Sequence, residues 1–209
     1  MVRHHHRALL CAALMIGSIA PAAAQQFSTI YTFPSYSGDW FPIGGLAMDN
    51  AGALYGTTQY GGIDQGIECD LCGTIYKLIP PGVGQTTWTY QLLHTFTNEP
   101  IQGYNEDGIR PVAPLTNFNN VFYGVASAGG DTSCGCGNIF SITPNGTYTI
   151  LHVFDPFVPG QPTNQWPNGT TPIGGLLIDS NGMMYGTASS GGTGPWAPTI
   201  RRVRASSTK

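Results

Sequence analysis

The chain has few charged residues and few of the residues that build long helices. Only 9% of its 209 residues are charged, and lysine and glutamate, which dominate coiled coils, occur two and three times. A coiled coil is therefore excluded. Glycine and proline number 29 and 16, and both weaken helix interiors, which argues against a helical bundle. Because aromatic residues make up 11% of the chain, a disordered acidic chain is excluded too. The composition predicts a mostly β protein.

The sequence also lacks the short motifs that mark common catalytic sites. It contains no Gly-x-Ser-x-Gly elbow, no His-Glu-x-x-His, no phosphate-binding loop and no dinucleotide-binding fingerprint. No residue resembles an activated nucleophile with a partnered base. The sequence therefore assigns no catalytic residue, no metal ligand and no cofactor.

Residues 1–24 have the organisation of a secretory signal peptide. Arg3 and Arg7 flank three histidines, residues 8–20 are apolar, and residues 22–24 are alanines that suit cleavage. The apolar run is shorter than the ~20 residues that a membrane-spanning helix requires. We expect a secreted protein, extracellular or periplasmic, with no membrane span in its mature chain.

Removal of this leader leaves an acidic chain. All eleven acidic residues follow residue 24, but only six of the eight basic residues do. A negatively charged protein repels the phosphate backbone, so nucleic acid is not an expected partner.

The strongest signal is an internal repeat. Pro42-Ile-Gly-Gly-Leu-Ala-Met-Asp49 returns as Pro172-Ile-Gly-Gly-Leu-Leu-Ile-Asp179, with Pro111-Val-Ala-Pro-Leu115 as a weaker middle copy. A turn and a Tyr-Gly run follow each copy, and then a glycine pair and further apolar runs. One period thus holds up to four short apolar runs separated by turn residues, which are strand and hairpin signals. Four antiparallel strands are the unit of a β-propeller blade.

We therefore predict an all-β, β-propeller-like fold of four-stranded antiparallel repeats. The β-repeat domain spans residues 25–203, with repeats at 42–110, 111–171 and 172–203, and residues 204–209 form a disordered tail. Residues 27–33 match the fourth run, and the third repeat ends after its third run, so we expect 27–33 to complete the third repeat. Three blades are fewer than the ~4–8 of closed propellers. This predicts a fragment of a larger ring, with an open arc or a compact three-unit assembly as alternatives.

These elements resemble a known family. The Pro-x-Gly-Gly-Leu, Leu54-Tyr-Gly-Thr-Thr58, Gly-Gly and Gly73-Thr-Ile-Tyr-Lys-Leu78 elements are similar to the tandem GloVer repeats of exported bacterial choice-of-anchor proteins, and more loosely to kelch blades. The resemblance covers residues 27–203 and is weaker in the middle copy, where Pro114 replaces a glycine. It implies a propeller-like fold and a bacterial surface or secreted setting, and it implies no catalytic residues.

Four cysteines follow the leader, as Cys69-x-x-Cys72 and Cys134-x-Cys136. Both pairs lie between the second and third runs, and each ends directly before a glycine, so the pairs are equivalent. Because disulfides persist in exported proteins, we predict structural disulfides, with pairing inside each loop as the simplest of three connectivities. A four-thiolate zinc site and free thiols are the alternatives.

His94 and His152 occupy the same place in the fourth run, where Tyr31 stands in the N-terminal segment. Since histidine and tyrosine alternate there, we predict a packing role. A metal site or a catalytic base on a common channel is the alternative.

Aromatic residues in the loops between repeats are the candidate ligand-binding residues, and they are Tyr36, Trp40, Tyr104 and Trp166. Trp40 and Trp166 fall at corresponding places before the Pro-Ile-Gly-Gly element. Exposed rings can stack on sugars or pack against proteins, and packing between repeats is the alternative role. We predict a binding or surface-display module for a glycan or another surface protein. The alternative is a secreted propeller-type hydrolase or lyase with a site on its channel face.

Overall fold

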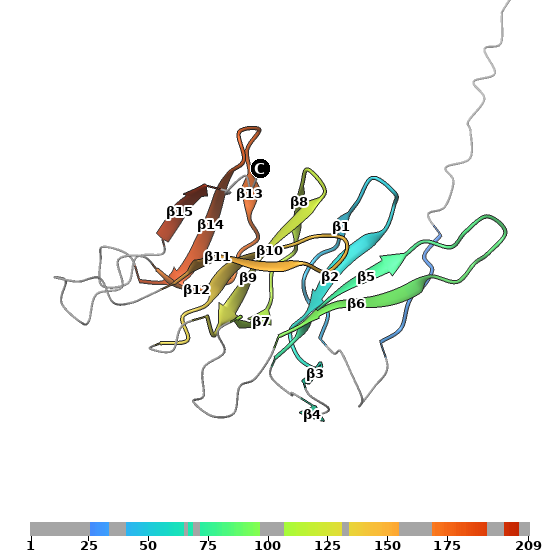
Figure 1. The fold of residues 1–209 in the computed structure, drawn as a ribbon, viewed down its shortest axis with the longest axis horizontal. Helices are drawn as coiled ribbons and strands as arrows, with labels where there is room; N and C mark the ends of the chain where they lie inside the picture. The colour runs from blue at the N-terminus through green and yellow to red at the C-terminus, as the bar shows by residue number, and fades with distance from the viewer. Residues whose placement is uncertain are drawn as a thin grey trace, which may run out of the picture.

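The computed structural model describes residues 26–33, 41–64, 67–68, 72–96, 107–130, 134–154, 169–191 and 199–204. These ranges contain fifteen strands and no helix, so the prediction of an all-β protein is confirmed. Figure 1 shows the strands as sheets that follow one another along the chain. In the part of the chain described, no helix is long and apolar enough to span a bilayer.

The first sheet contains the strands of the first repeat. Its order is β1 (Ala47–Met48), β2 (Leu54–Thr58), β5 (Thr74–Ile79) and β6 (Thr89–Thr95), with antiparallel neighbours. Strands β2 and β5 are the predicted Tyr-Gly and Gly-Thr-Ile runs. The loop between them holds a small two-stranded ribbon, β3 (Ile63–Asp64) with β4 (Ile67–Glu68), which the sequence did not predict.

The second and third sheets repeat this plan. The second contains β7 (Ile109–Pro111), β8 (Thr116–Phe118), β9 (Val121–Ala128), β10 (Asn138–Ile142) and β11 (Tyr148–Val153). The third contains β12 (Thr170–Pro172), β13 (Leu177–Ile178), β14 (Met183–Ser190) and β15 (Thr199–Arg204). Strand β7 pairs with β9 in the second sheet, and β12 pairs with β14 in the third. Each of these strands therefore crosses the repeat boundary that the sequence placed after residue 110 or 171.

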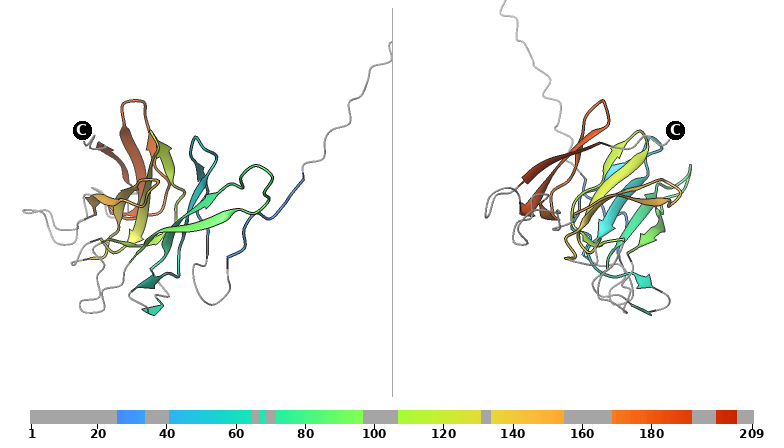
Figure 2. Two further views of the ribbon diagram at one scale, coloured as in Figure 1. Left: turned by 45° about the vertical axis from the view of Figure 1, so that its right-hand side comes forward. Right: turned by 60° about the vertical axis from the view of Figure 1, so that its left-hand side comes forward.

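The core lies between consecutive sheets rather than within one of them. Tyr55 of β2 stacks on Phe122 of β9 with ring centroids 3.7 Å apart. One cluster of buried residues joins the first and second sheets, and another joins the second and third. Figure 2 shows the resulting open arc. The second sheet buries its two faces against two different neighbours, as a propeller blade does.

The prediction that residues 27–33 complete the third repeat is wrong for a single chain. Residues 26–33 form no strand, and they lie against the first sheet. The ring of Phe33 is 5.0 Å from that of Tyr76, and the ring of Tyr31 is 5.2 Å from that of Tyr90. The first and third sheets pack on opposite sides of the second (Figure 1). The segment that precedes the first sheet therefore reaches only that sheet.

Candidate functional site

The loops that were predicted to bind ligands all begin and end at the same end of the sheets. In the first sheet this end is formed by residues that pair directly across three strands: Thr58, Thr74 and Thr95. In the second sheet the equivalent residues are Ala126, Asn138 and Val153. We call this end of the sheets the loop face. The opposite end carries the tight hairpins between β1 and β2, β8 and β9, and β13 and β14 (Figure 1).

The four candidate aromatic residues, Tyr36, Trp40, Tyr104 and Trp166, lie outside the described residues. The residues that flank their loops are described and lie at the loop face. The Phe41 carbonyl accepts a hydrogen bond from the Gln59 N–H, with N and O 3.0 Å apart. The Phe96 N–H donates to the Gly73 carbonyl at 3.1 Å, and the Phe154 N–H donates to the Gly137 carbonyl at 3.0 Å. The attachment points of the three loops are thus fixed on one face.

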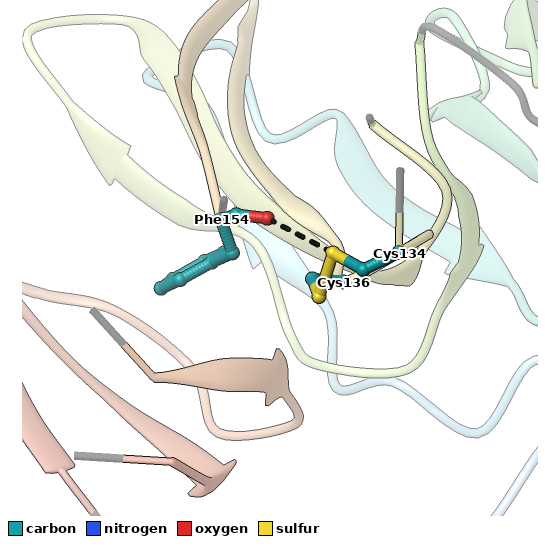
Figure 3. Close-up of a disulfide and its surroundings, with 3 residues drawn as sticks. All are labelled: Cys134, Cys136 and Phe154. Carbon is teal, nitrogen blue, oxygen red and sulfur yellow. Dashed lines mark hydrogen bonds between the residues drawn. A yellow bond between two sulfur atoms is a disulfide. The ribbon is translucent and has the colours of Figure 1, made fainter. Parts of the chain in front are cut away.

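The cysteine loop of the second repeat is closed by a disulfide. Cys134 and Cys136 are bonded, and Cys134 Sγ lies 3.6 Å from the Phe154 carbonyl oxygen (Figure 3). Because a disulfide sulfur carries no hydrogen, this is a close contact rather than a hydrogen bond. Cys72 is also disulfide-bonded, and Cys69 lies outside the described residues.

Disulfide sulfurs are not the thiolates that zinc requires, so these bonds are incompatible with the alternative of a four-thiolate zinc site. Within the described ranges, no group of three or more His, Cys, Asp or Glu side chains is arranged to hold a metal ion.

Directly beside each cysteine loop, a backbone hydrogen bond joins one repeat to the next. The Arg110 N–H donates to the Cys72 carbonyl at 2.9 Å, and the Thr171 N–H donates to the Cys136 carbonyl at 2.8 Å. We call this contact the repeat joint. Since both disulfides end at the residue whose carbonyl accepts the bond, the cysteine loops brace the joint as well as shape the loop face.

Glycine is required directly after each cysteine whose carbonyl accepts the hydrogen bond of the repeat joint. Gly73 and Gly137 have φ angles of +90° and +96°, which disfavour residues with a Cβ. A Cβ at these positions would lie 2.8 Å from Cδ of Pro111 and 2.7 Å from Cδ of Pro172. The proline of each following repeat therefore packs directly on the glycine that opens a strand of the preceding repeat.

The residue before the proline that begins each repeat, which is Pro42, Pro111 or Pro172, has a strained backbone. Phe41, Arg110 and Thr171 have φ angles of 60°, 55° and 54°, although residues other than glycine rarely adopt positive φ. A residue before proline also normally prefers an extended conformation. Such strain costs on the order of 1–3 kcal/mol per residue. The positive φ recurs at the same place in all three repeats, and at Arg110 and Thr171 it belongs to the residue whose N–H forms the repeat joint.

His94 lies in a polar cluster where the first repeat meets the second. Its Nε2 is 3.2 Å from Oδ2 of Asp107, and its ring stacks on Tyr148 with centroids 4.0 Å apart. The Asp107 carbonyl accepts hydrogen bonds from Tyr148 Oη at 2.6 Å and from Asn138 Nδ2 at 2.8 Å. Burial, with a smaller effect of the nearby Asp107 charge, raises the pKa of Tyr148, so its hydroxyl stays protonated and donates. Stacking on Tyr148 fits the predicted packing role of His94.

Sequence reasoning missed Asp107, Asn138 and Tyr148 as parts of this cluster. A signal was present, because Asp107-Gly108 and Asn168-Gly169 occupy the same place, with two residues between the glycine and the proline of the next repeat. Neither was assigned to a contact between repeats, because both belong to the loops between repeats, where no alternation of apolar residues marks them.

A second polar cluster closes the hairpins at the end opposite the loop face. Asp49 Oδ1 accepts the backbone N–H groups of Ala51 and Ala53 at 2.9 Å, and Oδ2 accepts the Tyr55 hydroxyl at 2.9 Å. Burial raises the pKa of Asp49, but these hydrogen bonds and the charge of Lys77 outweigh it and hold the pKa below its usual value. Asp179 makes the same contacts in the third repeat. Both aspartates therefore close the hairpin turn that follows them.

The fold and the joints define a class, an all-β protein built from tandem propeller-like sheets. The chain belongs to the Gloeobacter/Verrucomicrobia repeat family, whose model matches residues 16–195. This confirms the resemblance to GloVer repeats. No curated protein matches the chain.

Proposed function

We propose that the chain is an exported, propeller-type repeat module that binds carbohydrate or another surface protein through its loop face. The observation that carries this proposal is the common anchoring of the inter-repeat loops, which bear Trp40, Trp166, Tyr36 and Tyr104, at one end of the sheets. In this proposal the aromatic side chains of successive loops contact one extended ligand. Aromatic rings beside polar groups suit the apolar faces of sugars. The leader at residues 1–24 supports a secreted, extracellular or periplasmic location.

A glycan screen of the purified mature chain tests this proposal, with Trp40→Ala and Trp166→Ala as the decisive variants. Each substitution should weaken binding about tenfold, since removing an aromatic anchor typically costs more than about 1 kcal/mol. Trp88→Ala is the matched control. Trp88 lies in the connection between β5 and β6, at the end away from the loop face, and its replacement should leave the affinity unchanged. Equal binding by wild type and both loop variants would contradict the proposal.

The alternative function, a secreted hydrolase or lyase, has one observation in its favour, which is the His94–Asp107 pair at 3.2 Å. A histidine oriented by a carboxylate is a common general base. The face of the His94 ring is covered by Tyr148, which favours packing instead. Loss of turnover of a glycan substrate in His94→Tyr, with the fold retained, would favour the enzyme.

A further inference from the structure

Aromatic side chains mark the place where the fourth strand of one repeat rests on the next repeat. At the boundary between the first and second repeats, His94 of β6 stacks on Tyr148 with an interplanar angle of 1°. Phe96, two residues later, meets Phe140 edge-on at 5.6 Å and 65°. The two rings of the preceding repeat also contact each other edge-on at 4.9 Å.

The N-terminal segment reproduces this arrangement on the first repeat. Tyr31 stacks on Tyr90 with an interplanar angle of 13°, and Phe33 meets Tyr76 edge-on at 5.0 Å and 71°. Tyr31 and Phe33 contact each other edge-on at 5.1 Å. Residues 27–33 therefore occupy the position of the fourth strand of a repeat that would precede the first one, although they form no strand here.

The face of the first sheet beside this segment is only partly covered. Leu46 is 52% exposed, whereas the equivalent Leu115 and Leu176 are 5% and 6% exposed. The difference arises because a preceding repeat covers Leu115 and Leu176. The front of the first repeat thus has an apolar surface of the kind that a whole repeat covers elsewhere in this chain.

The face of the third sheet that points away from the second sheet is also exposed. In the first two sheets the equivalent face is covered by the next repeat. Leu177 is paired with Tyr185 as Ala47 is paired with Tyr55, but Leu177 is 69% exposed and Ala47 only 9%. Thr187 is exposed as well, while the equivalent Thr57 is 1% exposed.

The third sheet also lacks the pairing that the first two have at one edge. Strand β5 pairs with β6, and β10 pairs with β11. Strand β15 stands in the same position, and within the described ranges it pairs only with β14. An exposed edge of this kind is a template for another strand.

From these observations we propose that a second copy of this chain docks end to end with the first. The back of the third repeat of one copy packs on the front of the first repeat of the other, and residues 27–33 of the latter pair with β15 of the former. The contact is the repeat-to-repeat interface that the chain already uses twice. Each copy then has one surface of this contact left, the front of its first repeat or the back of its third. These two remaining surfaces form the same contact, which closes the pair as a ring. The three described large sheets of two copies together give about six blades, within the ~4–8 of closed propellers.

Light scattering after size exclusion gives the first test. The mature wild-type chain should have twice the mass of one chain, and Tyr31→Ala/Phe33→Ala should have the mass of one. Phe27→Ala is the control, because Phe27 belongs to the same segment but is 98% exposed, and this variant should remain a dimer. A wild type with the mass of one chain at all concentrations contradicts the proposal, and so does a series of larger masses, which would mean open head-to-tail growth.

A cysteine cross-link tests the strand pairing without weakening the interface. The register Thr74↔Thr95 in the first sheet and Asn138↔Val153 in the second places Thr199 opposite Thr32 of the other copy. Directly opposed Cβ atoms lie ~4.5–5.5 Å apart, close enough for a disulfide between Thr32→Cys and Thr199→Cys. The double variant should form a covalent dimer on non-reducing gels. Phe27→Cys with Thr199→Cys, about five residues or ~16 Å out of register, should not. A cross-link within one chain, or equal cross-linking in both variants, contradicts the proposal.

Discussion

At the scale of the residue, the repeat joint depends on positions where a side chain cannot be accommodated. Gly73 and Gly137 combine positive φ with contact to the proline of the next repeat. The sequence showed that a glycine opens the third run of the first two repeats, but not that another repeat lies against it. That contact depends on how the sheets stack, which no local pattern of residues encodes. The cysteine pairs were easier to interpret, because their short spacing and equivalent positions are visible in the chain itself.

Gly137→Ala should strongly destabilise the protein. The new Cβ would overlap the Ala126 carbonyl and lie 2.7 Å from Pro172 Cδ, on a residue with φ +96°. Overpacking and positive φ together should lower the free energy of unfolding by about 3–5 kcal/mol. Gly84→Ala is the control, because Gly84 has φ +78° but no atom within 4 Å of the added Cβ, and it should cost only about 1 kcal/mol. Urea titrations measure the free energy of unfolding of both variants. Equal losses in the two variants would show that the joint is not tightly packed.

Asp49 should make stability depend on pH in the acidic range. Its pKa in the folded chain lies below the usual value because of the hydrogen bonds from Ala53, Tyr55 and Ala51. The unfolded chain therefore binds the proton first, near pH ~3.9, and stability is lost as the pH falls through this range toward the folded pKa. In Asp49→Asn the loss between about pH 5 and pH 2 should be smaller. Unfolding free energies measured across this range for both proteins test the difference, and parallel curves would exclude a contribution from Asp49.

At the scale of the element, long strands were predictable and short ones were not. Strands β2, β9 and β14 contain the repeated Tyr-Gly runs, whose composition favours strands on its own. Strands β7 and β12 have three residues each and end in proline, which usually limits a segment to the edge of a sheet. They form because β9 and β14 extend far enough to pair with them. Residues 27–33 carry the aromatic pattern of a fourth strand, but within one chain they form no strand and pack on the first sheet.

His94 should be replaceable by tyrosine but not by alanine. Tyr31 occupies the equivalent place and stacks on Tyr90 as His94 stacks on Tyr148. His94→Ala removes the stacked ring and should lower the free energy of unfolding by about 1–3 kcal/mol. His94→Tyr keeps a ring and should lose no more than about 1 kcal/mol, since it gives up only the partly buried His94–Asp107 hydrogen bond. Thermal unfolding of the two variants tests this prediction. Equal destabilisation would mean that His94 stabilises the fold through its contact with Asp107 rather than through stacking on Tyr148.

At the scale of the whole molecule, the account describes three similar sheets that are stacked by one recurring contact. Each joint combines a strained residue before proline, a glycine without room for a side chain, and a carbonyl next to a disulfide. The joints hold the attachment points of the inter-repeat loops on one face, and they leave two complementary surfaces at the ends of the arc. The proposed binding through the loop face and the proposed pairing with a second copy both depend on this stacking.

Amide hydrogen exchange at Arg110 and Thr171 tests that stacking most directly. Their N–H groups donate to the Cys72 and Cys136 carbonyls of the preceding repeat and to nothing in their own sheets. If the sheets are joined as described, both amides exchange as slowly as the central amides of β9 and β14. Rapid exchange at both positions, while β9 and β14 remain protected, would mean that the sheets fold separately and that the arc does not exist in solution.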